Sequence, residues 1–109
     1  MKVIFLPKVQ DYLDSLVPIF YEKGYFRFVD SAINYVEDLI DDIETNLPTK
    51  LHKFAPPRFD SYGKNMHYAM FRKNRQTTWY VFFTKYNEND NIIYLVRYVA
   101  NNHIIAQYL

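Results

Sequence analysis

The feature that most constrains this chain is a change in the spacing of its apolar residues near the midpoint. Between residues 7 and 46 they recur every three or four positions, as on one face of a helix. Between residues 66 and 99 they follow the twofold alternation of strands. A chain of 109 residues with this pattern is predicted to form a single α+β domain, residues 1–109.

Two helices are predicted before the midpoint, over residues 7–22 and 25–46. Pro7 suits the first turn of a helix, whereas Pro18 predicts a kink or break because a proline inside a helix has no N–H to donate. Gly24 is expected to cap the first helix. Each helix has one apolar face, so the two are expected to form a hairpin that lies across a sheet.

Four strands are predicted, one before the helices and three after a long irregular connection at residues 48–65. The element order is then β-α-α-β-β-β, with the two-helix hairpin packed on one face of an antiparallel sheet. Loops as long as the connection often carry function in small domains. The strands are expected at residues 2–6, 66–72, 77–86 and 92–99.

The net charge of +1 conceals an uneven distribution of charged residues. Residues 1–46 carry four Lys or Arg and nine Asp or Glu, whereas residues 47–109 carry nine Lys or Arg and three Asp or Glu. This split predicts one face that meets a polyanion and another that repels it. The alternative is two solvated faces that attract each other weakly.

Composition excludes several classes of function. The chain has no cysteine, which rules out disulfides and thiolate chemistry and fits a reducing cytoplasm. Two glycines, Gly24 and Gly63, are too few for a glycine-rich phosphate loop. The three histidines lack the spacing of metal ligands, so neither a metal nor a cofactor is expected. No apolar run approaches the ~20 residues of a membrane span, and the N-terminus lacks a signal-peptide cleavage site. A cytoplasmic location is therefore expected.

Arg97 stands alone inside an otherwise apolar strand and is followed by the polar patch Asn101-Asn102-His103. A charge in such a strand has to be paired or used, because burying it costs free energy. RNA cleavage needs a base, an acid and a cation for the developing phosphorane. An arginine suits the last role, and His103 can be base or acid near neutral pH, with Tyr108 a weaker donor. The alternatives are an ion pair between Arg97 and a helix carboxylate, and an exposed or capping His103.

Alternation places Leu95, Arg97 and Val99 on one face of the last strand and Tyr98 on the other, so Arg97 and Tyr98 are not expected in one site. Arg97 is expected on the face that the helices leave uncovered, beside the long loop. Trp79 has the ring to stack a base, but it and most of the other aromatic residues are expected in the core. The predicted catalytic residues are Arg97, His103 and Arg75, and the predicted RNA-binding residues are Lys64, Arg72, Lys73, Lys85 and Tyr108.

The segment RQTTWYVFFTKYNENDNIIYLVRYVANNHIIAQYL combines an aromatic-rich strand, a polar turn and a final strand with an arginine before a polar tail. It resembles the toxins of the RelE/ParE superfamily, as does the element order along the whole chain. The resemblance implies the toxin of a type II toxin–antitoxin module, a ribosome-dependent mRNA endonuclease that inhibits translation. Its implied partners are a cognate antitoxin protein, the ribosome and mRNA. A ParE-like, non-enzymatic block of DNA gyrase is the first alternative, and a small RNA-binding or protein-interaction domain is the second.

The match to the nucleases of this superfamily is partial. Arg97-Tyr98 is similar to an Arg-Tyr pair near the end of those chains. His103 and Tyr108 can replace missing groups only if the tail folds back. An antitoxin helix or strand is expected in an exposed apolar groove of the toxin. The His-Tyr pair that ends those nucleases falls here at Val99-Ala100. Their two strand lysines fall at Tyr68 and Met70. The arginine that opens their next strand falls near Thr78 or Trp79, and Arg75 is close to that position.

Overall fold

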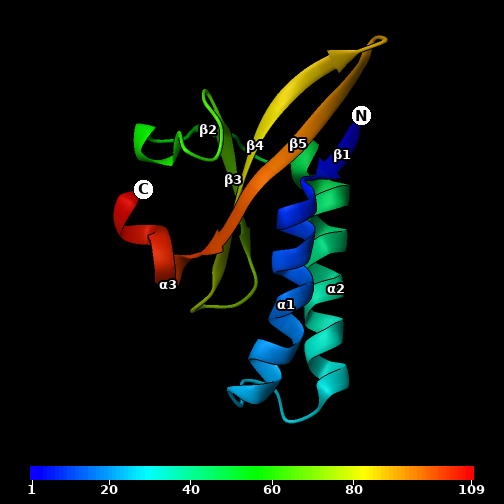
Figure 1. Cartoon of the computed structure of the whole chain (residues 1–109), viewed down its shortest axis with the longest axis vertical. Coiled ribbons are helices and arrows are strands. Elements are labelled where there is room, and N and C mark those ends of the chain that lie inside the picture. Colours follow the sequence, from blue (N-terminus) through cyan, green and yellow to red (C-terminus); the bar gives the residue numbers. More distant parts are fainter.

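In the computed structural model, which describes residues 1–109, a hairpin of two long helices lies along one side of a five-stranded sheet (Figure 1). The fold is therefore α+β, as the change of period predicts. None of the helices combines the length and the apolar character that a membrane-spanning segment requires. The elements are β1 (Lys2–Phe5), α1 (Pro7–Glu22), α2 (Val29–Asn46), η1 (Leu47–Thr49), β2 (Lys53–Phe54), η2 (Pro57–Phe59), β3 (His67–Arg72), β4 (Thr78–Glu88), β5 (Asn91–Asn101), α3 (Asn102–Ile105) and η3 (Ala106–Tyr108).

The sheet has the strand order β1-β5-β4-β3-β2 and is mixed, so the prediction of an antiparallel sheet is wrong for one pair. β1 runs parallel to β5, and the other three pairs are antiparallel. Short turns force β3, β4 and β5 to be antiparallel, but the first strand meets the last across almost the whole chain. Its direction is set by how the helical hairpin returns the chain to the sheet, which no local pattern encodes.

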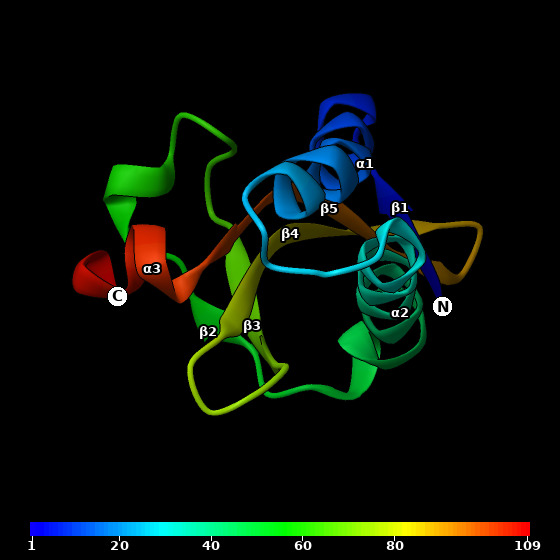
Figure 2. The same ribbon diagram turned by 90° about the horizontal axis from the view of Figure 1, so that it is seen from below.

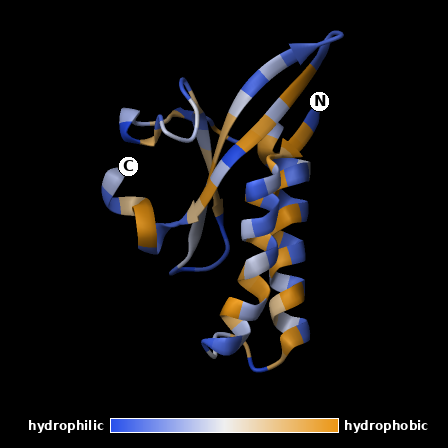
Figure 3. Ribbon diagram, in the orientation of Figure 1, coloured by the Kyte–Doolittle hydropathy of each residue, from blue (hydrophilic) through white to orange (hydrophobic).

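The β4–β5 hairpin is longer than predicted. Its turn consists of Asn89 and Asp90 alone, both with positive φ (50° and 63°), so pairing extends to Glu88 and Asn91. Two-residue turns with positive φ match the right-handed twist of a hairpin, and Asn and Asp tolerate that conformation. The hairpin projects beyond the other strands, and its tip is polar (Figures 1 and 3). The short strand β2 falls inside the connection that was predicted to be irregular.

The first helix has the predicted limits, Pro7 to Glu22, and continues through Pro18 without the break that was one predicted outcome. Gly24 caps it as predicted: its φ is +77°, its N–H donates to the Tyr21 carbonyl, and the Tyr25 N–H donates to the Phe20 carbonyl. These two bonds form a Schellman motif. Because the motif and an extended Phe28 intervene, α2 begins at residue 29 rather than 25.

Two apolar clusters lie on opposite faces of the sheet. The larger joins α1 and α2 to the sheet face that carries Trp79, Val81 and Phe83. The smaller packs Phe59 of η2 and Ile105 of α3 against the other face. The loop and the C-terminal tail therefore cover much of the face that was expected to be open (Figure 2). Apolar residues follow the inner sides of the helices and run along β5 (Figure 3).

Candidate functional site

A β-bulge at Arg97 changes how the last strand presents its side chains. Phe82 pairs with Tyr98 and Phe83 pairs with Val96, so Arg97 is an extra residue in β5. The alternation reverses at this point: Val96 and Val99 both join the helix-side cluster, while Tyr98 packs against the cluster on the other face. The predicted assignment of Val99 and Tyr98 to faces is therefore wrong, because one inserted residue inverts every later position.

Arg97 is held by hydroxyl groups rather than by a carboxylate. Its Nε donates to Thr84 Oγ1 at 3.0 Å, and one Nη donates to the Tyr86 hydroxyl at 2.6 Å. The ion pair with a helix carboxylate, considered as an alternative, is not formed. Hydrogen bonding with Thr84, and secondarily with Arg97, lowers the pKa of the Tyr86 phenol. The loop residue Gly63 packs against the Arg97 side chain, which places Arg97 on the loop side of the sheet, as expected.

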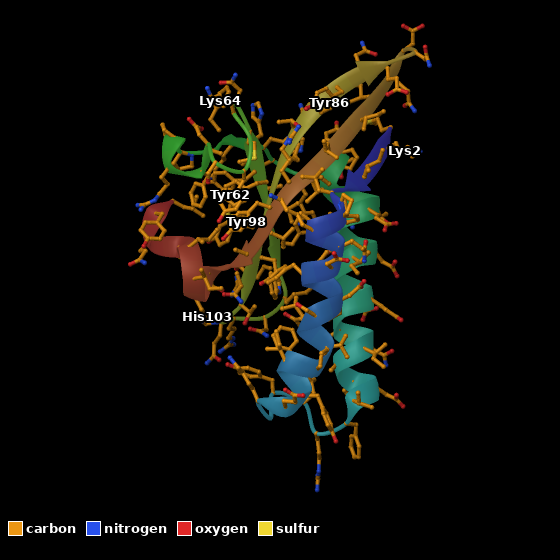
Figure 4. The ribbon with its side chains drawn as sticks, viewed as in Figure 1. Lys2, Tyr62, Lys64, Tyr86, Tyr98 and His103 are labelled. Carbon is orange, nitrogen blue, oxygen red and sulfur yellow. The ribbon has the colours of Figure 1, made fainter.

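The polar patch at the end of β5 has three different roles. Asn101 Oδ1 accepts the His103 N–H and caps α3. Asn102 secures the β3–β4 turn, because its Oδ1 accepts the Thr78 N–H and its Nδ2 donates to the Gln76 carbonyl. The exposed His103 ring makes no hydrogen bond within the chain. It lies at the far end of β5 from Tyr86 (Figure 4).

His103 faces a cleft of about 680 Å³ between the helical hairpin and the β3–β4 turn. We call this the hairpin cleft. One wall is aromatic and comes from α1, α2 and the loop between them. The opposite wall is polar and comes from the β3–β4 turn and the end of β5. The lining residues are Phe20, Tyr25, Phe26, Tyr35, Lys73, Asn74, Gln76, Thr77, Trp79, Asn101 and His103.

The aromatic wall is a packed cluster. Phe20 lies 5.8 Å from Tyr25, 6.0 Å from Phe26 and 5.6 Å from Tyr35, measured between ring centroids. Trp79 closes the back of the cleft, where its indole Nε1 donates to the Tyr35 hydroxyl at 2.9 Å. Burial raises the pKa of Tyr35, an effect that this hydrogen bond partly offsets. The wall therefore presents ring surface held in place from behind.

The polar wall carries one ammonium group, one imidazole and several amides. Lys73 Nζ lies 3.6 Å from Asp42 Oδ2 of α2, which ties the turn to the helical hairpin. Arg72 Nε donates to the Asn74 carbonyl, and Asn74 Oδ1 accepts the Gln76 N–H, so the turn is internally braced. Such a wall can bind an anion at Lys73 and exchange a proton at His103.

The structure brings some of the predicted site residues together and separates others. Lys73 and His103 line the hairpin cleft, while Arg72 ends β3 and Arg75 lies in the turn beside it. Arg97 lines a different groove, of about 240 Å³, so the predicted pair of Arg97 and His103 does not share a pocket. The other predicted RNA-binding residues lie outside both: Lys64 in the loop after η2, Lys85 over the Tyr94 ring, and Tyr108 stacked with Arg58.

Sequence reasoning missed the aromatic wall. Tyr25 and Phe26 were counted as part of a helix, whereas they form the loop that overhangs the cleft. The run FYEKGYFRF, residues 20–28, has five aromatic residues around Gly24. Because a glycine cap ends the helix there, the five aromatic side chains cannot all face the core. The density of aromatic residues around Gly24 was therefore the sequence signal that predicts an exposed aromatic surface. Trp79 is a core residue, as expected.

Charges are also segregated in space. Most acidic residues of α2 are exposed, and carboxylates follow the outer side of the helix (Figure 4), whereas Asp42 contacts Lys73 of the β3–β4 turn. Most basic residues lie in the strands, turns and loops, although Lys8 belongs to α1 and Arg58 to η2. The exposed acidic residues of α2 are Glu37, Asp38, Asp41 and Glu44. The exposed basic residues of the second half of the chain include Lys53, Arg58, Lys64, Arg72 and Arg75.

No group of three histidine and carboxylate side chains lies close enough together to hold a metal ion. No protein-family model matches the chain, and no curated protein or solved structure matches it.

Proposed function

We propose that this chain is a toxin that acts on single-stranded RNA held in the hairpin cleft, as a ribosome-dependent mRNA endonuclease. One observation carries the proposal. In a cleft of about 680 Å³, a wall of aromatic rings faces a wall with Lys73, His103 and side-chain amides. Rings that stack bases, set opposite cations for the phosphates, are the usual means of binding single-stranded RNA.

Each wall of the cleft has its own role in this proposal. An unstacked base lies on Tyr25 or Phe26, and the amides of Asn74 and Gln76 meet its polar edge. A phosphate beside Lys73 competes with Asp42 for the ammonium group, while Arg72 and Arg75 add positive charge at the rim. His103 takes the 2′-hydroxyl proton or returns one to the leaving 5′-oxygen. Its ring is free for this because no group in the chain binds it.

The proposal includes a protein partner. A toxin of this class is kept inactive by a cognate antitoxin, and the concentration of basic residues in the second half of the chain suits an acidic one. Co-expression with the product of the neighbouring small gene tests this point. Separate elution of the two proteins at micromolar concentration would count against the partnership.

Inhibition of DNA gyrase without catalysis is the second candidate. A different observation favours it: Arg97 and His103, which were predicted to cleave RNA together, line separate pockets. A protein with a binding cleft but an incomplete catalytic set blocks its target rather than cutting it.

Induction of the chain in bacteria distinguishes these candidates. Endonuclease action predicts growth arrest with cleavage of ribosome-bound mRNA by the purified protein, and His103→Gln abolishes both effects. His67→Gln is the matched control, because His67 lies outside the cleft. Arrest with inhibited supercoiling and intact mRNA selects the gyrase candidate. Harmless induction contradicts both and leaves a small RNA-binding or protein-interaction domain.

A further inference from the structure

Four segments of the chain enclose a small groove of about 240 Å³ beside the end of β5. The first half of α1 forms one wall, the loop after η2 and the short helix α3 form the other, and β5 forms the floor. Val99 and Ala100 of the floor are only 3% and 2% exposed, so no further strand can pair with β5 there. At the packing density of protein interiors, ~0.74, the space holds a ligand of roughly ten non-hydrogen atoms. The groove therefore fits a small molecule.

Three tyrosines give this groove flat walls and neutral hydroxyl groups, and we call it the tyrosine groove. Tyr62 and Tyr98 stack with their ring centroids 3.9 Å apart and their planes inclined by 11° (Figure 4). Burial, and then the nearby phenols of Tyr62 and Tyr12, raises the pKa of Tyr98 to about 12. Burial also raises the pKa of Tyr12, whose hydroxyl makes no hydrogen bond within the chain. Phenols that stay protonated can donate hydrogen bonds to an anion.

The tyrosine groove carries positive charge that nothing in the chain neutralises. Lys8 and Arg97 are the charged residues of its lining, which contains no carboxylate. The one ion pair of the chain joins Lys73 to Asp42, away from this groove. Arg97 uses two of its five N–H groups on hydroxyls of β4 and keeps the others available. The groove thus combines an apolar, flat-walled space with two cations.

We propose that the tyrosine groove binds a small aromatic carboxylate, whose ring lies against the tyrosine walls and whose carboxylate meets Lys8 and Arg97. A flat ring gains offset stacking on tyrosine side chains. A planar carboxylate matches the fork of a guanidinium group. A nucleotide is too large for this groove, so the inference goes beyond the RNA proposal and does not rest on it.

The test titrates 3-phenylpropionate into the ¹⁵N-labelled protein. We expect saturable shifts of the Val9, Tyr98 and Val99 amides, with half-saturation at about 1 mM or below for a ligand of this size. The amides of Asn74 and Gln76 should not shift, because they belong to the hairpin cleft. The location of the shifts therefore separates this site from the RNA site.

Two comparisons isolate the charge. 3-Phenylpropanamide has the same shape without the negative charge and should bind about tenfold more weakly. Lys8→Gln should weaken binding of the carboxylate about fivefold and leave binding of the amide compound unchanged. Lys73→Gln, the matched control, makes the same charge change in the hairpin cleft and should bind both compounds as the parent does.

Several results would overturn the proposal. Equal binding of the carboxylate and the amide compound, or unchanged binding by the Lys8→Gln protein, would remove the role of charge. Shifts confined to the hairpin cleft, or no saturation at about 10 mM ligand, would remove the site. Tighter binding of phenyl phosphate than of 3-phenylpropionate would show that the assigned class of ligand is wrong.

Discussion

Gly63 and Arg97 are in such close contact that a Cβ atom at position 63 would stand 2.5 Å from Cδ of Arg97. A side chain at position 63 would therefore force the Arg97 side chain to shift. Gly63→Ala should push the Arg97 side chain away from Thr84 and Tyr86. With both hydrogen bonds lost, the free energy of unfolding should fall by about 1–3 kcal/mol in urea denaturation. In an Arg97→Ala background the clash is absent, and the same substitution should cost much less. An equal cost in both backgrounds would show that the contact is not the cause.

Tyr35 supports the back of the hairpin cleft. Tyr35→Phe removes the hydroxyl that accepts the Trp79 indole N–H and leaves that donor buried without a partner. Thermal unfolding should show a loss of about 1–3 kcal/mol in the free energy of unfolding. The matched control is Tyr12→Phe, because the Tyr12 hydroxyl makes no hydrogen bond and burial raises its pKa. If the two substitutions have the same effect, the Tyr35–Trp79 bond contributes nothing to stability.

Asn102 holds the β3–β4 turn against the end of β5. Asn102→Ala removes two hydrogen bonds, to the Thr78 N–H and to the Gln76 carbonyl. We expect a loss of about 1–3 kcal/mol and faster hydrogen exchange of the Thr78 amide. Asn87→Ala, at an exposed position in β4, should change stability by less than about 0.5 kcal/mol. Unchanged exchange at Thr78 would mean that the turn is held by other contacts.

His67 makes stability depend on pH. Burial, and then the positive charges of Lys85 and His52, lowers the pKa of His67 below its ordinary value of 6.5. The unfolded chain then binds a proton more readily than the folded one. The stabilising contribution is complete above pH 6.5 and is lost as the pH falls from 6.5 through the lowered folded pKa. His67→Gln should flatten the dependence of the unfolding midpoint on pH in this range. A profile identical to that of the parent would contradict the assignment.

Local patterns carried much of the fold. Residue spacing predicts the extent of α1 and the succession of β3, β4 and β5. Two backbone rules, proline in the first turn of a helix and glycine after its end, predict the start of α1 and the Gly24 cap. The parallel pairing of β1 does not, because it depends on contacts across almost the whole chain. The bulge cannot be predicted from the sequence for another reason. Arg97 and Tyr98 look like ordinary alternating residues, and the extra residue is recognised only when β5 is aligned with its partner strand β4.

The candidate site shows the same division. Lys73 and His103 were selected for their chemistry, and both line the hairpin cleft. Arg97 was selected as a lone charge in an apolar strand, yet the bulge directs it to Thr84 and Tyr86 instead. No sequence rule distinguishes these two outcomes for a basic residue. The loop with Tyr25 and Phe26 lies across the cleft from the β3–β4 turn, about fifty residues further along the chain. Tertiary packing alone determines that these two segments face each other.

Binding of a fluorescent single-stranded RNA, followed by anisotropy, tests whether the hairpin cleft holds RNA. Tyr25→Ala removes an exposed ring of the hairpin cleft, and Lys73→Gln removes its ammonium group. Phe54→Ala and Lys53→Gln make the same changes at exposed positions of β2. We expect each cleft substitution to weaken binding about tenfold, or ~1.4 kcal/mol, and both controls to bind as the parent does. Equal binding by all five proteins, or weakening by the β2 controls alone, would contradict it.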